Sequence, residues 1–131
     1  VAKENAQHND AHVPFMIGDM LKPLADRDLK VDILISNPPY IPIHEEMERS
    51  VVDYEPHVAL FGGEDGLKYY RMIFADCRKV LKDQAMMAFE MGWNQRAGME
   101  QLMKEYFPHD RYEIVRDMSG KDRMLFVYIN V

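Results

Sequence analysis

The chain has little of what stabilises or anchors proteins outside a reducing compartment. One cysteine among 131 residues leaves no internal disulfide, and no apolar run approaches the roughly 20 residues that a transmembrane helix needs. The first ten residues, VAKENAQHND, are polar and lack the apolar core of a secretory signal. These absences favour a soluble cytoplasmic protein without membrane contact.

The chain also lacks an excess of basic residues. Its 16 Lys and Arg against 22 Asp and Glu give a net charge of −6, whereas a broad nucleic-acid surface needs clustered positive charge. We therefore expect no direct nucleic-acid binding. The histidines are scattered without the spacing of metal ligands, so we predict no metal site: His8, His12, His44, His57 and His109.

An initiator methionine is missing too, and the first residues already have helical spacing with no capping residue ahead of them. We therefore expect a part of a longer protein. A chain of 131 residues suffices for one core, and no linker or repeat divides it. We expect a single domain portion over residues 1–131.

What is present is an alternation of helices and strands. After a helical stub, the apolar patterns predict strands at 13–17 and 31–36, a helix over 67–82, a strand at 85–90, a helix over 94–107, and strands at 111–116 and 123–129. Such alternation indicates an α/β fold with a parallel sheet, in which the short connection DMSGKD allows an antiparallel last pair. The strand at 31–36, rich in branched aliphatic residues, suits a central buried position.

Three segments follow predicted parallel strands. Ligands bind at the carboxyl ends of such strands, which selects Gly18-Asp19-Met20, Asn37 to Tyr40 and Glu90-Met91-Gly92. We expect all three along one edge of the sheet. From Ile41 to Gly66 the sequence predicts no clear regular structure: HEEMERSVV can hold a helical turn, whereas YEPHVALFGGEDG indicates a long ordered loop. Loops of this length are usually functional or disordered.

The tetrapeptide Asn37-Pro38-Pro39-Tyr40 allows two interpretations. Proline has a fixed φ and no N–H, so the pair can simply end a strand. The same stiffness can hold the Asn37 side chain and the proline carbonyls as acceptors for both hydrogens of an NH2 group, whose lone pair then faces an electrophile. The position after a buried parallel strand favours this second interpretation.

Other polar residues also have two interpretations. Glu90 can orient the substrate or a loop, or cap nearby backbone N–H groups. Glu55 and Pro56 can belong to a flap over the substrate or stabilise their own loop. A salt-bridged structural turn is favoured for Asp117, Asp122 and Arg123, and Cys77, on the apolar face of a helix, is assigned to the core.

Five stretches of the sequence carry a resemblance. They are GDMLKPL (18–24), ISNPPYIP (35–42), YEPHVALFGGEDGLKYYR (54–71), FEMGWNQ (89–95) and, more weakly, RDMSGKDR (116–123). The long stretch at 54–71 is the most specific of them. They resemble class I S-adenosylmethionine-dependent methyltransferases, and more specifically the protein glutamine N5-methyltransferases of the HemK/PrmC family, which modify the Gly-Gly-Gln motif of peptide release factors.

This resemblance implies the C-terminal portion of one catalytic domain. The fold would be a partial Rossmann-like sheet, mostly parallel with an antiparallel C-terminal strand and lacking the first two strands. Asn37 would contact the substrate amide and the cofactor, S-adenosylmethionine, while Pro38, Pro39 and Tyr40 frame the glutamine side chain. Asp19 and Met20 would lie near the adenine of the cofactor.

The family's glycine-rich cofactor loop and ribose-binding acidic residue do not occur in the 131 residues. We therefore expect the isolated chain to bind S-adenosylmethionine weakly or not at all. In the family's strand order the two absent strands lie between 13–17 and 31–36, so the segment 13–17 would have to pair with its neighbour or with another molecule.

Three functional hypotheses follow. The leading one is methyl transfer to a protein glutamine, with a peptide release factor as partner. The alternative is adenine N6-methylation of nucleic acid, which uses the same tetrapeptide and requires base flipping in DNA. The third is a fragment without activity of its own.

Overall fold

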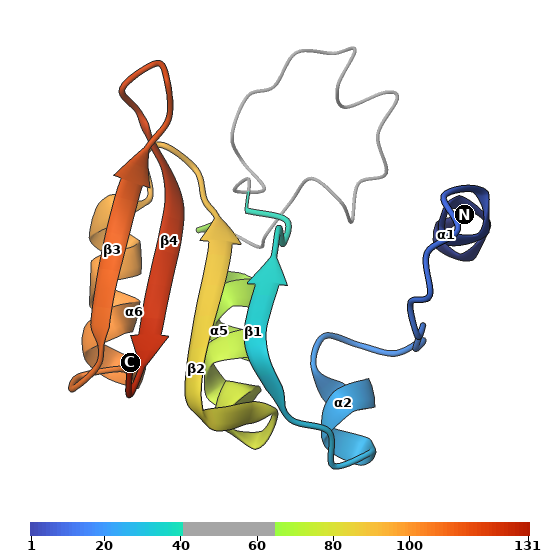
Figure 1. Ribbon diagram of the computed structural model, residues 1–131. Coiled ribbons are helices and arrows are strands. Elements are labelled where there is room, and N and C mark those ends of the chain that lie inside the picture. The colour runs from blue at the N-terminus through green and yellow to red at the C-terminus, as the bar shows by residue number, and fades with distance from the viewer. Residues whose placement is uncertain (41–64) are drawn as a thin grey trace.

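The computed structural model describes residues 1–40 and 65–131, and these residues form a four-stranded sheet with helices packed against one face (Figure 1). The elements are α1 (Ala2–His8), α2 (Lys22–Asp26), β1 (Val31–Ser36), α5 (Lys68–Asp76), the 3-10 turn η1 (Cys77–Lys79), β2 (Leu81–Glu90), α6 (Arg96–Tyr106), β3 (Arg111–Arg116) and β4 (Asp122–Ile129).

The strand order is β1-β2-β4-β3. β1 runs parallel to β2, and β4 runs antiparallel to both β2 and β3. Three strands therefore point one way and the C-terminal strand points the other, which confirms the predicted sheet. The helix α5 lies between β1 and β2 in the chain, as a parallel connection requires.

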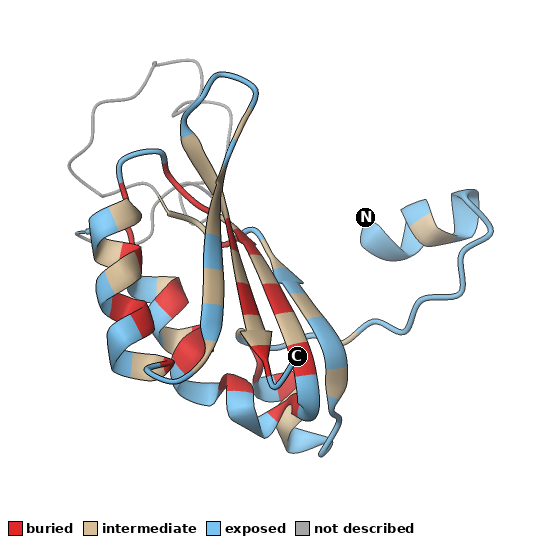
Figure 2. Cartoon of the chain, turned by 60° about the vertical axis from the view of Figure 1, so that its left-hand side comes forward, coloured by how far each residue is buried: buried red, intermediate tan, exposed pale blue. Residues whose placement is uncertain are grey.

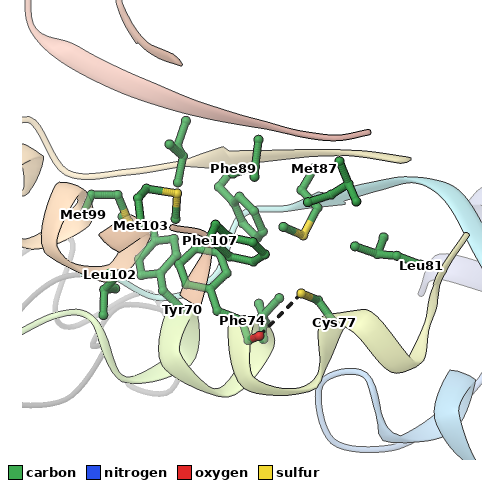
Figure 3. Close-up of a cluster of buried hydrophobic side chains, with 14 of the residues drawn as sticks. Tyr70, Phe74, Cys77, Leu81, Met87, Phe89, Met99, Leu102, Met103 and Phe107 are labelled. Atoms are coloured by element: carbon green, nitrogen blue, oxygen red, sulfur yellow. Dashed lines mark hydrogen bonds between the residues drawn. The ribbon is translucent and has the colours of Figure 1, made fainter. Parts of the chain in front are cut away.

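The core lies between the sheet and the helices α5 and α6 (Figure 3). Alternate residues of the strands face these helices, because successive side chains of a strand point to opposite faces. The ring of Phe74 on α5 lies edge-on to Phe89 of β2 and to Phe107 after α6, with centroid distances of 5.3 Å in both cases. These aromatic contacts fix α5 and α6 on the same face of the sheet.

No helix of the described residues packs on the opposite face of the sheet (Figure 2). Ile33 and Ile35 of β1 point to this face and are 56% and 77% exposed. The expectation that this strand is central and buried on both faces is therefore wrong: β1 is an edge strand. No helix in the described part of the chain covers its second face, and no described strand pairs with its outer edge.

The strand expected at residues 13–17 does not form. The segment is irregular, with Val13 and Ile17 52% and 96% exposed, and α1 before it has no buried residue and lies apart from the sheet (Figure 1). The expectation that the segment pairs with a neighbour is wrong as well. An apolar pattern alone does not stabilise a strand. Without a neighbouring strand, the backbone N–H and C=O groups have only water as a hydrogen-bond partner.

Some element boundaries differ from the pattern. The helix predicted over 67–82 ends at Asp76, and β2 already begins at Leu81. The apolar residues Val80 and Leu81, which fitted the helical spacing, are buried at the turn into the strand instead. Ahead of this helix, a side-chain oxygen of Asp65 accepts the backbone N–H of Leu67 at 3.0 Å. None of the described helices is long and apolar enough to cross a membrane.

The segment before β1 contains the short helix α2. Pro23 lies in its first turn, where a missing N–H costs nothing. Gly18 packs closely on this turn, since a Cβ at Gly18 would lie 2.3 Å from Cγ of Pro23. This close approach requires glycine at position 18.

Candidate active site

The carboxyl ends of β1 and β2 lie side by side, as predicted. Ser36 pairs with Phe89 across the two parallel strands, so Asn37 and Glu90 follow at neighbouring positions. Both line a hollow of about 280 Å³ that opens on the uncovered face of the sheet, with Met124 and Phe126 of β4 on its far side. Asn37 is exposed, so its side-chain amide is available to a ligand.

The two prolines end β1 at Ser36 and continue inward. Pro38 is buried and Pro39 is half-buried, while Asn37 before them remains exposed. Because neither proline has an N–H or a free φ, the segment cannot extend the ladder of β1 and has few conformations. Both interpretations of the tetrapeptide are therefore compatible with the geometry: the strand ends here, and the polar group stands on a stiff support.

Tyr40 is held by its hydroxyl group. The hydroxyl donates to Oε1 of Glu90 at 2.9 Å and accepts from Nη1 of Arg123 at 3.2 Å. Burial raises the pKa of Tyr40, and the Glu90 carboxylate raises this pKa further. The hydroxyl therefore stays protonated at neutral pH, and Tyr40 contributes a positioned ring rather than a base.

Glu90 takes part in this arrangement with both its side chain and its backbone. Its carboxylate accepts the Tyr40 hydroxyl, and its backbone carbonyl accepts the hydroxyl of Tyr70 on α5. Of the interpretations given for Glu90, the structure supports the one in which it orients a loop, here the segment after β1. The contact of Tyr70 with the site was missed, because its helical spacing indicated only a core residue.

Arg123 connects the β3–β4 hairpin to the site. Its Nη1 lies 3.4 Å from the carbonyl of Met91, and its Nε donates to Asp117 at 3.3 Å. Asp117 also accepts backbone N–H groups of the turn; the N–H of Lys121 contributes most, and together with the others it lowers the pKa of Asp117. The predicted salt-bridged turn is confirmed, with an additional contact to Tyr40.

Asp122 forms the other half of this turn. It accepts two hydrogen bonds from Arg96 of α6, at 2.9 and 3.0 Å, and these lower its pKa. The ion pair joins the hairpin to α6 rather than to the site. Asp122 is therefore structural, in agreement with the interpretation from sequence.

A buried amide on the turn after β2 was also missed. Gln95 is 6% exposed, donates to the carbonyl of Tyr40 at 2.7 Å and accepts the N–H of Gly92 at 2.9 Å. Its only signal in the sequence is its place at the end of the FEMGWNQ stretch. Its contact with Tyr40, 55 residues away in the chain, depends on the tertiary fold.

Asp19 and Met20 lie elsewhere. They line a separate hollow of about 300 Å³ beside α2, with Met72, Asp76 and Lys79 on and after α5. The expectation that Gly18-Asp19-Met20 shares an edge with Asn37 is therefore wrong. The segment before Gly18 is not a strand of this sheet. The rule that ligands bind at the carboxyl ends of parallel strands therefore does not apply to Gly18-Asp19-Met20.

Several expected residues lie outside the described part of the chain: Glu55, Pro56, His44, His57 and the loop that carries them. Within the ranges 1–40 and 65–131, no three His, Cys, Asp or Glu side chains are grouped closely enough to hold a metal ion. Cys77 is fully buried in the core, and burial raises the pKa of its thiol to about 11. This agrees with its predicted structural role.

Comparison with known proteins gives a consistent result. The chain is 44% identical over 131 residues to a release factor glutamine methyltransferase of Bacillus anthracis, and 39% identical over 132 residues to one of Bacillus subtilis. These matches cover 98% and 99% of this chain and 46% of each relative. The chain thus spans about half the length of the curated relatives it matches. No protein-family model matches it.

A solved structure is similar as well. The protein-(glutamine-N5) methyltransferase (release factor-specific) of Alicyclobacillus acidocaldarius superimposes with a TM-score of 0.54 and 28% sequence identity, over 80% of this chain and 52% of that protein. The similarity in sequence and the similarity in fold lead to the same group of proteins. The chain is thus similar, in sequence and in fold, to release factor glutamine methyltransferases over about half of their length.

Proposed function

We propose that this chain forms part of a methyltransferase that uses S-adenosylmethionine to methylate the side-chain amide nitrogen of a protein glutamine. The observation that supports this most directly is the Asn37–Tyr40 segment, a stiff polar turn at the carboxyl end of β1 held by Glu90 and Arg123. The names of the relatives support a glutamine of a release factor as the substrate. The Gly-Gly-Gln motif as the modified position is what the resemblance in sequence implies. Such a substrate would place the protein in the cytoplasm.

The task of the Asn37–Tyr40 segment would be to activate a poor nucleophile. The lone pair of an amide nitrogen is delocalised, so it attacks only when its N–H groups are polarised and water is excluded. The side-chain oxygen of Asn37 and a backbone carbonyl of the proline pair are acceptors that could grip both hydrogens. The ring of Tyr40 offers a flat apolar surface against which the planar amide can pack.

The residues described for this chain supply only part of a cofactor site. Asn37 and Glu90 line the hollow at the strand ends, whereas Asp19 and Met20 line another hollow. When bound, S-adenosylmethionine would supply the electrophilic methyl group. We assign to Asn37 the contact between amide and cofactor, and we keep Asp19 and Met20 as candidates for the adenine end only.

The proposal is tested on the intact protein, by which we mean the whole methyltransferase that contains this chain. It is incubated with tritiated S-adenosylmethionine and one of three acceptors: a release factor, the same factor with Gly-Gly-Ala in place of Gly-Gly-Gln, or DNA. We expect label in the first acceptor alone. Asn37→Ala should lower kcat by about 10²-fold or more, as loss of a charge-stabilising group does. Asn5→Ala, on α1 and far from the site, is the matched control. Label in DNA would support the adenine methyltransferase instead.

A further inference from the structure

We propose that Gln95 is a positioning residue of the candidate active site. Its buried side-chain amide holds the carbonyl of Tyr40, and through it the Asn37–Tyr40 segment, against the turn between β2 and α6. The consequence for catalysis rests on the proposed function. The structural part of the proposal is independent of that function, because it concerns only the hydrogen bonds between Gln95 and the turn after β1.

Gln95 is unusual in its surroundings. Among the described residues it is the one buried amide, with 6% of its surface exposed, and no charged side chain is buried to this extent. Its Nε2 lies 2.7 Å from the carbonyl oxygen of Tyr40 and 3.4 Å from that of Gly66, and its Oε1 accepts the backbone N–H of Gly92 at 2.9 Å. A buried amide is stable only when its polar atoms are paired, and here both ends of the amide are paired.

The chemistry of the three contacts selects this residue type. Two backbone carbonyls need a donor with two hydrogens, and one backbone N–H needs an acceptor on the same side chain. A primary amide supplies both, and one orientation alone satisfies all three contacts. A glutamate would bring no donor to the two carbonyls, and an asparagine is one methylene shorter. Gln95 is therefore matched to this position by its chemistry and by its length.

The three backbone groups belong to three different segments. Tyr40 ends the turn after β1, Gly66 precedes α5, and Gly92 follows β2. Gln95 thus joins three segments at the edge of the sheet where the candidate site lies. Since Tyr40 is held by Glu90 and Arg123 through its hydroxyl, Gln95 adds the hold on its backbone.

The prolines extend this hold to Asn37. A flexible segment would let Asn37 move while Tyr40 stays in place, but two successive residues with fixed φ make the turn nearly rigid. A fixed Tyr40 carbonyl therefore limits the positions of the Asn37 amide. Reactions that depend on aligned groups lose rate steeply with small misplacements, about 10²-fold for 1 Å.

Gly92 offers a second way to disturb the contact. A Cβ at this position would lie 3.0 Å from Oε1 and 3.1 Å from Cδ of Gln95, closer than ordinary contact. Gly92→Ala should therefore push the amide of Gln95 aside while Gln95 itself is retained. Gln95→Leu removes the polar atoms at similar size. The matched control is Gln101→Leu, the same change at an exposed position of α6.

The test combines a structural and a kinetic measurement on the intact protein. By NMR, we expect Gln95→Leu and Gly92→Ala to shift the carbonyl carbon of Tyr40 and the side-chain amide of Asn37, and Gln101→Leu to leave both unchanged. In methyl transfer to the release factor, the two variants should lower kcat by about tenfold or more at a temperature where they are fully folded, with KM for the cofactor within about threefold.

A merely structural role would give a different result. Leu102→Ala, a core variant on α6, should lose stability without a change in the site. Its kcat, measured at a temperature where the variant is fully folded, should stay within about twofold of the wild type. Unshifted Tyr40 and Asn37 signals in both variants, or an unchanged kcat, would overturn the proposal. A wild type without methyl transfer would refute the proposed function, and the NMR comparison would still decide whether Gln95 holds Tyr40.

Discussion

At the scale of residues, the site depends on Tyr40, a side chain that can neither accept nor donate a proton readily in the proposed reaction. Its hydroxyl lies between the carboxylate of Glu90 and the guanidinium of Arg123, and its backbone carbonyl is bound by Gln95. Asn37, which would touch the substrate, is exposed and two prolines away. Under the proposed function, Asn37 would thus be placed by neighbours that do not react.

Tyr40→Phe tests the hydroxyl contacts. The change removes the hydrogen bonds to Glu90 and Arg123 and leaves the ring, so the free energy of unfolding should fall by about 1 kcal/mol. Urea unfolding measures this difference. Tyr112→Phe is the control, because its hydroxyl has no hydrogen-bond partner among the described residues and its loss should cost nothing measurable. Equal effects of the two changes would contradict the role given to the Tyr40 hydroxyl.

The turn of the β3–β4 hairpin should depend on pH through Asp117. Its pKa lies below the usual range in the folded chain, chiefly because the N–H of Lys121 stabilises the charged form. A lowered folded pKa gives stability that is present above the unfolded pKa of about 3.9 and is lost as pH falls through the folded pKa.

Asp117→Asn keeps an acceptor but removes this charge. The difference in free energy of unfolding between wild type and variant should therefore be largest near neutral pH and shrink below about pH 4. Urea unfolding between about pH 7 and pH 3 measures it. Asp28→Asn, at an exposed turn, serves as the control. A difference for Asp117→Asn that stays constant down to pH 3 would show that the carboxylate charge has no part in holding the turn.

At the scale of elements, β1 has two different sides. Its inner edge pairs with β2 and its carboxyl end carries the site, while its outer edge and one of its faces are uncovered in the described structure. Exposed strand edges and apolar faces favour association with other chains. We therefore expect the 131-residue chain to self-associate through this side of β1.

Ile35→Lys tests that expectation. Ile35 is 77% exposed on the uncovered face, near the end of the edge strand β1, and a charge there should shift the chain toward monomer in sedimentation experiments over a range of concentrations. Met118→Lys is the control, since Met118 is fully exposed on the β3–β4 turn, beyond the strand edge. Association that Ile35→Lys does not weaken would place the contact elsewhere on the chain.

The elements also show what could be predicted from the sequence. The apolar patterns predicted the positions of β1, β3 and β4 in the chain, although the central, buried place expected for β1 was wrong. The start of β2 was missed because Lys82, Asp83 and Gln84 are polar and exposed, although they lie in the strand. The segment 13–17 has the pattern of a strand but no partner to pair with, and no local pattern records whether a partner exists.

The site was predicted in the same uneven way. The adjacency of Asn37 and Glu90 followed from a general rule about parallel sheets, and the structure confirms it. The contacts of Gln95 and Arg123 with Tyr40 join residues 55 and 83 positions apart, so they depend on the register and the packing of the whole sheet. Asp19 and Met20 were misplaced because the same rule was applied to a strand that does not form.

At the scale of the whole molecule, the described structure has a complete core on one side of the sheet and an open site on the other. α5 and α6 bury the helix-facing side, whereas the hollow beside Asn37 opens on the uncovered side. The chain also spans about half the length of the relatives it matches. The core and the candidate site therefore lie in different parts of the described structure, and a stable chain need not be one that binds the cofactor.

The last prediction follows from this separation. The hollow at Asn37 has a volume of about 280 Å³, at the low end of the range of roughly 300–1,000 Å³ of small-molecule sites, and it is open on one side. Asp19 and Met20, the other cofactor candidates, line a different hollow. We therefore expect the 131-residue chain to bind S-adenosylmethionine weakly or not at all in isothermal titration calorimetry.

The control is the Bacillus anthracis release factor glutamine methyltransferase at full length, titrated in the same buffer, which should release measurable heat. Low-micromolar binding by the 131-residue chain would contradict the prediction. In that case Asn37→Ala locates the bound cofactor: a loss of affinity would place it in the hollow at the end of β1, whereas an unchanged affinity would place it away from Asn37. Because the binding measurement needs no methyl acceptor, its outcome bears on the cofactor site alone and leaves the identity of the methylated protein to the labelling experiment.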